Sequence, residues 1–136
     1  MTLVGIEHAV NTAVYARLNG SATLLAAATG GVHDNPPQPM MYPYAQLGES
    51  IATKDATFEA DGRNIVCTLH VWSQYAGTKE AATIMGIIGD LLDEYTLSVS
   101  GCTVESCEIE SSRIMRDPDG ITRHGILELR VRVATT

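Results

Sequence analysis

The chain has 136 residues, 45% of them apolar, with nine Lys/Arg against sixteen Asp/Glu. This length predicts a single domain over residues 1–136 that can bury a core without disulfides, and the three cysteines show no framework spacing. The net charge of −7 argues against a general nucleic-acid binder, because such binding relies on Lys and Arg that neutralise phosphates. Without a signal peptide or an apolar run of roughly 18–20 residues, we expect a cytoplasmic protein with no membrane contact.

An N-terminal helix is predicted over residues 3–18. Thr2 is its expected N-cap, because a hydroxyl can accept a hydrogen bond from the first turn. Asn19 and Gly20 end this helix, and Ser21 is placed to cap a short second helix over residues 22–28. The apolar residues of the first helix step by three or four and predict one buried stripe, formed by Leu3, Ile6, Val10, Val14 and Leu18.

Proline dominates the segment that follows. Residues 32–44 hold four of the five prolines, and proline fixes φ and removes a hydrogen-bond donor, so we expect an extended surface loop and no central strand. Residues 44–51 predict a first strand. Residues 52–63 are polar and end in an Asp61-Gly62 turn, which leaves two alternatives, the arm of a long hairpin or a mobile loop.

Residues 64–73 predict a central strand, because both of its faces are partly apolar. A helix is predicted over residues 78–95, with Gly86 and Gly89 in its interior, where each glycine is unfavourable relative to alanine. We favour a tolerated local weakness or close packing within the subunit as the reason for these glycines, and the alternative is close approach of a neighbouring subunit. The apolar stripe of this helix consists of Ala81, Ile84, Met85, Ile88, Leu91, Leu92 and Tyr95.

The chain ends in a predicted hairpin over residues 102–133. Its turn, Asp117-Pro118-Asp119-Gly120, predicts a three-residue loop with a bulge that places Asp117 opposite Ile121. The same register pairs Cys107 with Val131, Glu108 with Arg130 and Ile109 with Leu129, whereas a slip by one residue would set apolar side chains against carboxylates. The predicted core face is Ile121, Leu127, Leu129, Val131 and Val133, and the outward face is Thr122, His124, Glu128, Arg130 and Arg132.

The element order is therefore helix, helix, strand, strand, helix, strand, strand. The compact solution for this order is an α+β fold, with a mostly antiparallel sheet of about four strands and helices packed on one face.

No constellation for catalysis, metal binding or cofactor binding emerges from the sequence. Cys67 and His70 are three residues apart on a predicted strand, so they point to opposite faces and cannot share a metal ion. The motifs of nucleophile elbows and phosphate-binding loops are absent, and Cys67 is better explained as a small core residue. We expect no enzyme activity, no catalytic residue, no metal and no cofactor.

Opposite charges are separated along the chain. Asp90, Asp93 and Glu94 lie on the polar face of the predicted helix, whereas five arginines lie on the hairpin. A basic hairpin that meets the acidic helix of the next copy would make a heterologous contact, and such contacts can close into rings. The alternative is that both faces are simply solvated. The five arginines are Arg113, Arg116, Arg123, Arg130 and Arg132.

A series of short motifs occurs in order along almost the whole chain. VHDNPP at residues 32–37 is followed by Pro43-Tyr44, by Lys54-Asp55, by LHVWS at residues 69–73 and by RDPDGITRHG at residues 116–125. The Trp-Ser strand end and the Asp-Gly-x-Thr-Arg-His-Gly turn are the most specific of them. In this order the motifs resemble the tail-completion, or tail-terminator, proteins of long-tailed phages and of phage-like particles such as gene transfer agents.

This resemblance implies a structural virion protein that assembles in the host cytoplasm and resides in the tail neck. It implies a homo-oligomeric ring, expected to be a hexamer, that caps the head-proximal end of the tail tube and stops tube polymerisation. The implied partners are the major tail tube protein and the head–tail connector or adaptor, and DNA would pass through the channel without sequence-specific binding.

Three regions are expected to contact a neighbouring subunit or the tube. The polar arm at residues 53–61 should reach a neighbour or the tube, the loop at residues 36–44 should pack at a subunit boundary, and the turn at residues 117–120 should project toward one end of the ring. With the adjoining hairpin residues, the expected contacts are Thr53, Lys54, Asp55, Phe58, Glu59, Asp61, Pro36, Pro37, Tyr42, Tyr44, Arg116, Asp117, Asp119, Arg123, His124, Arg130 and Arg132.

Two other hypotheses of function are compared with that of a tail terminator. A different neck component, such as a head-completion adaptor, would form a ring but bind the portal instead of the tube. A small α+β enzyme or ligand-binding domain would need a concave pocket with converging polar groups.

Overall fold

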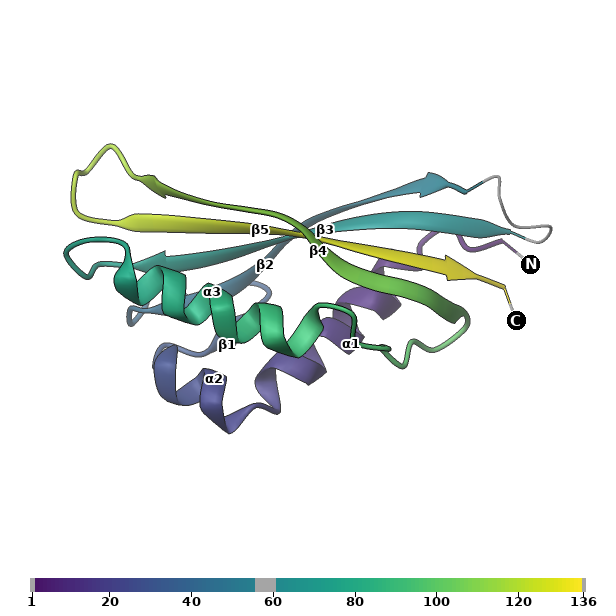
Figure 1. The fold of residues 1–136 in the computed structure, drawn as a ribbon, viewed down its shortest axis with the longest axis horizontal. Helices are drawn as coiled ribbons and strands as arrows, with labels where there is room; N and C mark the ends of the chain where they lie inside the picture. The colour runs from purple at the N-terminus through teal and green to yellow at the C-terminus, as the bar shows by residue number, and fades with distance from the viewer. Residues whose placement is uncertain (1, 56–60, 136) are drawn as a thin grey trace.

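The computed structural model describes residues 2–55 and 61–135. Its sheet has five strands in the order β1-β2-β3-β5-β4, antiparallel except for the β1–β2 pair. The predicted α+β class is confirmed, with one short strand more than expected (Figure 1). In chain order the elements are α1 (Glu7–Asn19), α2 (Ala22–Ala27), β1 (Val32–His33), β2 (Tyr44–Lys54), β3 (Gly62–Ser73), α3 (Lys79–Leu92), β4 (Thr103–Arg116) and β5 (Arg123–Ala134).

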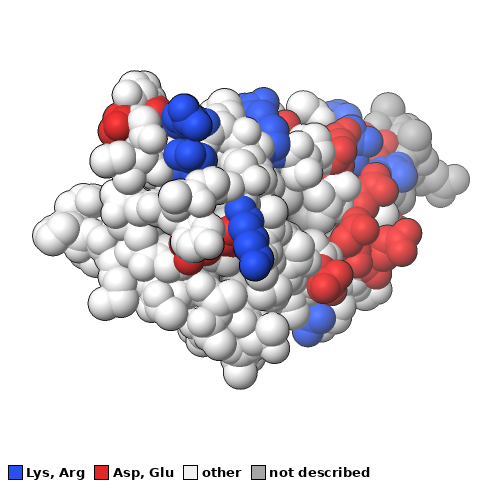
Figure 2. Space-filling view, turned by 60° about the vertical axis from the view of Figure 1, so that its left-hand side comes forward, with Lys and Arg blue, Asp and Glu red and all other residues white. Residues whose placement is uncertain are grey.

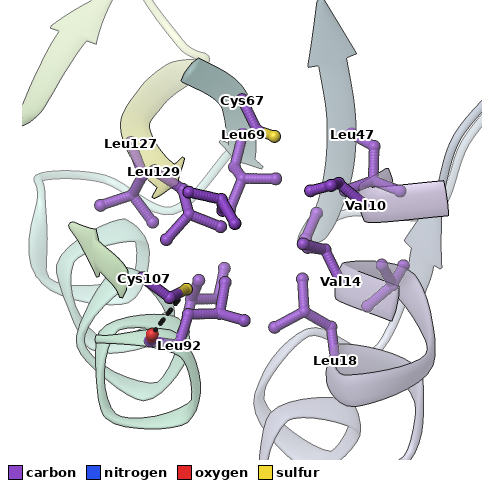
Figure 3. Packing of buried hydrophobic residues seen from close by; sticks show 14 of the residues in the cluster. Val10, Val14, Leu18, Leu47, Cys67, Leu69, Leu92, Cys107, Leu127 and Leu129 are labelled. Atoms are coloured by element: carbon purple, nitrogen blue, oxygen red, sulfur yellow. Dashed lines mark hydrogen bonds between the residues drawn. The ribbon is translucent and has the colours of Figure 1, made fainter. Parts of the chain in front are cut away.

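All three helices lie on one face of the sheet (Figure 1). Strands β3 and β5 alternate buried and half-buried residues, because their odd-numbered side chains point toward the helices. The core forms where these side chains meet α1 and α3, and Figure 3 shows Leu69 and Leu129 of the sheet near Val14 and Leu92 of the helices. No helix in the described ranges is long and apolar enough to span a membrane.

The first helix begins later than predicted. Gly5 has a φ of +88°, which interrupts the helical backbone, so α1 starts at Glu7. Thr2 does not cap α1, since its hydroxyl accepts a hydrogen bond from the Val4 N–H instead. The predicted cap of α2 is confirmed, because the Ser21 hydroxyl accepts a hydrogen bond from the Leu24 N–H at 3.2 Å.

The proline-rich segment contributes one short strand. Val32 pairs with Ala45 in the parallel β1–β2 ladder, at the edge of the sheet, and the residues up to Pro43 form a loop. The loop is anchored where the Gly30 N–H donates to the Pro43 carbonyl oxygen at 2.8 Å. Of the alternatives for residues 52–63, the described part favours a hairpin arm, since β2 extends to Lys54 and β3 begins at Gly62.

The centre of the β4–β5 pairing matches the predicted register. Cys107 faces Val131, Glu108 faces Arg130 and Ile109 faces Leu129. Beyond Ile109 the register shifts by one residue at a bulge, so the strands end with Arg116 opposite Arg123.

The predicted three-residue loop of this hairpin is therefore wrong, and residues 117–122 form the connection. The shift exposes Ile121, which is 60% accessible and not part of the core as predicted. Thr122, predicted to face outward, is instead buried, and its N–H and hydroxyl both donate to the Asp119 carboxylate. The Ile121 N–H donates a third hydrogen bond to the same carboxylate.

Helix α3 is shorter than predicted. It ends at Leu92 because Asp93 is extended and Glu94 takes a left-handed φ of 56°. Tyr95 thus lies outside the helix, where the Arg17 guanidinium carbon sits 3.7 Å from its ring centroid. The buried part of the predicted stripe is Ala81, Ile84, Met85, Ile88 and Leu92.

The two glycines of α3 do not serve packing within the subunit. A Cβ added at Gly86 or at Gly89 would meet no atom within 4 Å. The explanation by close internal packing is wrong, because both positions face open space. A tolerated weakness of the helix and close approach of a neighbouring subunit are the two explanations that this geometry leaves.

Candidate interaction site

The strand registers place the three predicted contact regions at two ends of the sheet. Tyr44 pairs with Trp72, which pairs with His124, so the proline loop and the β4–β5 turn share one end. Thr53 pairs with Asn64, so the polar arm lies at the opposite end, where Figure 1 also shows both chain termini. The predicted contacts therefore form two separate groups.

At the arm end, the described residues are held by interactions within the subunit. The Asp61 carboxylate accepts hydrogen bonds from the Leu3 N–H at 2.9 Å and from Arg63 at 3.2 Å, and chiefly the first of these lowers the pKa of Asp61. Asp55 pairs with Arg132 at 2.9 Å. These bonds fix the base of the arm to the N-terminus and to β5.

The remaining arm residues contribute differently. Thr53 and Lys54 are exposed at the end of β2, and the Thr53 hydroxyl donates to the Asn64 carbonyl oxygen at 3.3 Å. Phe58 and Glu59 lie outside the described residues.

At the other end, aromatic rings form a row on the sheet face away from the helices. The ring centroids of Tyr42 and Tyr44 are 5.3 Å apart, those of Tyr44 and Trp72 are 6.5 Å apart, and those of Trp72 and His124 are 3.8 Å apart. The indole N–H of Trp72 donates to Gln46 at 3.1 Å. The row joins two regions that the sequence singled out separately, the proline loop and the hairpin.

His70 extends this row and was missed as a contact residue. Its Nδ1 lies 2.6 Å from Nε2 of His124, so the two rings share a hydrogen bond. Burial lowers the pKa of both histidines, and the charge of His70 further lowers the pKa of His124. The alternation of β3 placed His70 and Trp72 on one face, but only the strand register shows that they meet His124.

Pro36 is half-buried and Pro37 is exposed, so this part of the loop is accessible for contacts. Tyr44, in contrast, is 5% exposed. Tyr44 therefore packs beneath the loop, against the ring of Tyr42, and presents little surface for a contact.

The hairpin turn has a fixed backbone and a charged base. The Asp119 carboxylate accepts from the N–H groups of Ile121 and Thr122, each at 2.8 Å, and from the Thr122 hydroxyl at 2.7 Å. These bonds, led by the one from the Thr122 N–H, lower the pKa of Asp119. Half-buried Asp117 closes the turn, because its N–H donates to the Thr122 carbonyl oxygen.

The five arginines of the hairpin do not form one basic face. Arg130 pairs with Glu110 and Arg132 with Asp55 within the subunit. Within residues 2–55 and 61–135, the three arginines nearest the turn have no ion pair, and these are Arg113, Arg116 and Arg123.

Acidic residues gather elsewhere on the surface. Asp90, Asp93 and Glu94 are exposed at the end of α3, and Glu105 and Glu108 are exposed on β4. Figure 2 shows many of the Asp and Glu side chains gathered on one part of the surface, while Lys and Arg side chains are spread over the same face, some of them beside these acids. The predicted separation of charge is therefore only partial.

A groove of about 880 Å³ lies between α3 and β4. Gly86 and Gly89 line its helix side, Ile109 and Ile114 line its strand side, and Asp90 stands at its rim. It is an open groove with an apolar floor and charged edges, as found in many protein–protein contacts.

The described residues hold no group of three or more His, Cys, Asp or Glu side chains that could bind a metal ion. Cys107 is buried and its thiol donates to the Leu92 carbonyl oxygen at 3.3 Å (Figure 3). Burial is the main cause that raises the pKa of Cys107 to about 12, so this sulfur remains a thiol at neutral pH.

Comparison with known proteins gives this arrangement its context. A family model described as "Tail completion protein gp17" matches residues 12–134. The chain is 30% identical over 104 residues to the "Tail completion protein gp17" of Bacillus phage SPP1, which covers 75% of each protein.

The fold is also similar to solved structures. A chain from the "Virion of native gene transfer agent (GTA) particle" superposes with a TM-score of 0.88 at 24% identity, covering 95% of this chain and 97% of that one. The "Structure of bacteriophage SPP1 gp17 protein" gives a TM-score of 0.61 at 23% identity, covering 95% and 90%. The chain therefore belongs to the tail completion protein gp17 family, and its role is that of a structural protein of the virion tail.

Proposed function

We propose that this protein forms a ring, a hexamer, on the head-proximal end of the tail tube. The ring stops tube polymerisation and joins the tail to the head–tail connector. The observation that carries this proposal is the family match over residues 12–134, because it covers most of the chain with a model of tail completion proteins. Assembly would take place in the host cytoplasm before the ring becomes part of the virion.

The charge distribution supports a ring. Arg116 and Arg123 lie beside the hairpin turn without an ion pair in the described residues, whereas Asp90, Asp93 and Glu94 are exposed at the end of α3. The two arginines of one copy can therefore meet the carboxylates of another. A contact between two different surfaces is heterologous, and repeated heterologous contacts close into a ring or continue into a filament. A ring is the form that fits the end of a tube.

The overall charge supports a channel that lets DNA pass. With a net charge of −7, the chain has few cations to neutralise phosphates, and this neutralisation supplies most sequence-independent affinity. A ring built from such chains would repel DNA weakly instead of retaining it.

Tube assembly in vitro tests the proposal. The purified major tail tube protein is polymerised with and without this chain, and tube lengths are measured by negative-stain electron microscopy. We expect shorter tubes with a ring at one end. Tubes of unchanged length with no bound ring would contradict tube capping, and binding to the portal alone would instead indicate a head-completion adaptor.

A further inference from the structure

The side of α3 that faces β4 is open and has the shape of an acceptor surface. Its groove measures about 880 Å³. A Cβ at Gly86 or Gly89 would meet nothing within 4 Å, so no group inside the subunit requires a glycine there. Glycine is unfavourable in a helix interior, and its presence at two groove positions leaves room for a group from outside.

The lining of the groove defines the chemistry of its occupant. Ile109 and Ile114 are only partly buried and give the groove an apolar floor. Asp90 and Asp93 stand on the α3 side of this floor, and Arg113 stands on the β4 side. An apolar side chain flanked by cations toward α3 and by carboxylates toward β4 would satisfy the whole lining.

The turn between β4 and β5 carries this combination. Ile121 is 60% exposed at the tip, and the hydrogen bonds to Asp119 fix the backbone that presents it. Arg116 and Arg123 flank the tip, and neither has an ion pair in the described part of the chain. Asp117 and Asp119 lie between them in the same turn, so the tip carries charges of both signs. A large apolar side chain on a fixed loop loses little conformational freedom when it is inserted.

We propose that Ile121 of one copy inserts into the α3–β4 groove of the next copy, with Arg116 and Arg123 facing Asp90 and Asp93. This inference rests on the proposed ring and assigns the contact that builds it. The tip and the groove are different surfaces, so each copy donates one tip and receives another, and the contact is head-to-tail.

Two substitutions test the two sides of the contact separately. Ile121→Asp places a carboxylate at the tip, and Gly86→Leu fills the groove. Each should weaken self-association by about tenfold to a hundredfold, the cost of removing one large apolar side chain from an interface. The readout is mass by light scattering over a concentration series, under the conditions in which the wild-type ring forms.

Matched controls separate assembly from folding. Val4→Asp changes another exposed apolar residue, 77% accessible, and Thr83→Leu enlarges an exposed α3 residue that does not line this groove. Both controls should form rings like the wild type. Thermal melting followed by circular dichroism should show Gly86→Leu to be at least as stable as wild type, because it replaces a helix glycine.

A mixture of the two variants gives the sharpest outcome. Gly86→Leu keeps an intact tip and Ile121→Asp keeps an intact groove. Equimolar mixing, at a concentration at which wild type assembles and neither variant does so alone, should therefore yield pairs of chains and nothing larger. Rings of wild-type mass formed by either variant, or a mixture of monomers alone, would overturn the contact. If the wild-type chain assembles neither alone nor with the tube protein, the proposed ring fails too, whereas wild-type rings with unaffected variants reject only this contact.

Discussion

The two sides of α3 differ in how closely they are packed. On the sheet side, Ile84, Ile88 and Leu92 are at most 1% exposed and pack into the core. On the groove side, Gly86 and Gly89 have empty space where a side chain would be. The packed side contributes to stability, and the open side is the proposed surface for assembly.

A substitution on the packed side of α3 should have the largest effect on stability. Ile88→Ala should lower the free energy of unfolding by about 2–5 kcal/mol, because it removes buried methyl groups and leaves a cavity. Thr83→Ala, on the exposed surface of the same helix, should change it by no more than about 0.5 kcal/mol. Urea denaturation measures both, and equal effects would contradict the assignment of the packed side.

Glycine-to-alanine substitutions should change stability in opposite directions at a closely packed position and at an open one. Gly30→Ala should destabilise the protein by about 1–3 kcal/mol, because its Cβ would collide with the backbone carbonyl oxygens of Met41 and Pro43. Gly86→Ala should instead stabilise it by about 0.5–1 kcal/mol, since the position is helical and open. Loss of stability in Gly86→Ala would show that the groove side is packed after all.

A smaller effect concerns the histidine pair away from α3. Their pKa values are lowered in the folded state, mainly by burial, so the unfolded chain binds more protons at mildly acidic pH. Stability should therefore fall as the pH drops from about 8 through the unfolded histidine pKa of about 6.5. Denaturation of wild type and of His70→Gln as a function of pH checks this, with His8→Gln, an exposed α1 residue, as control.

The stability of His70→Gln should depend less on pH than the stability of the wild type does. The substitution removes one of the two lowered pKa values and the effect of His70 charge on His124. An identical pH profile for wild type and His70→Gln would contradict the assignment.

The features that were predicted correctly from the sequence follow from the periodic spacing of apolar residues. The alternation of β3 and the pairing of Ile109 with Leu129 follow from burying one face, which penalises any slip of the register. The bulge after Ile109 was not predictable in this way, because it leaves the central pairs intact and shifts only the exposed end. The exposed Ile121 follows from that shift.

The regions expected to bind a neighbour were harder to predict, because each is built from residues that lie far apart in the sequence. Tyr44, Trp72 and His124 come from three strands, and only their registers align the rings. Asp61 and Arg132, expected to contact a neighbour, each make a polar contact within the subunit at the base of the arm. Polarity alone does not distinguish a charge that binds a partner from one that is paired within the subunit.

The solution mass of the wild-type chain is the decisive measurement for the proposed ring. It should be measured by light scattering, with and without the major tail tube protein. We expect a closed ring near six times the 14.6 kDa of one chain, formed alone or on the tube. A strict monomer that never binds the tube would contradict it.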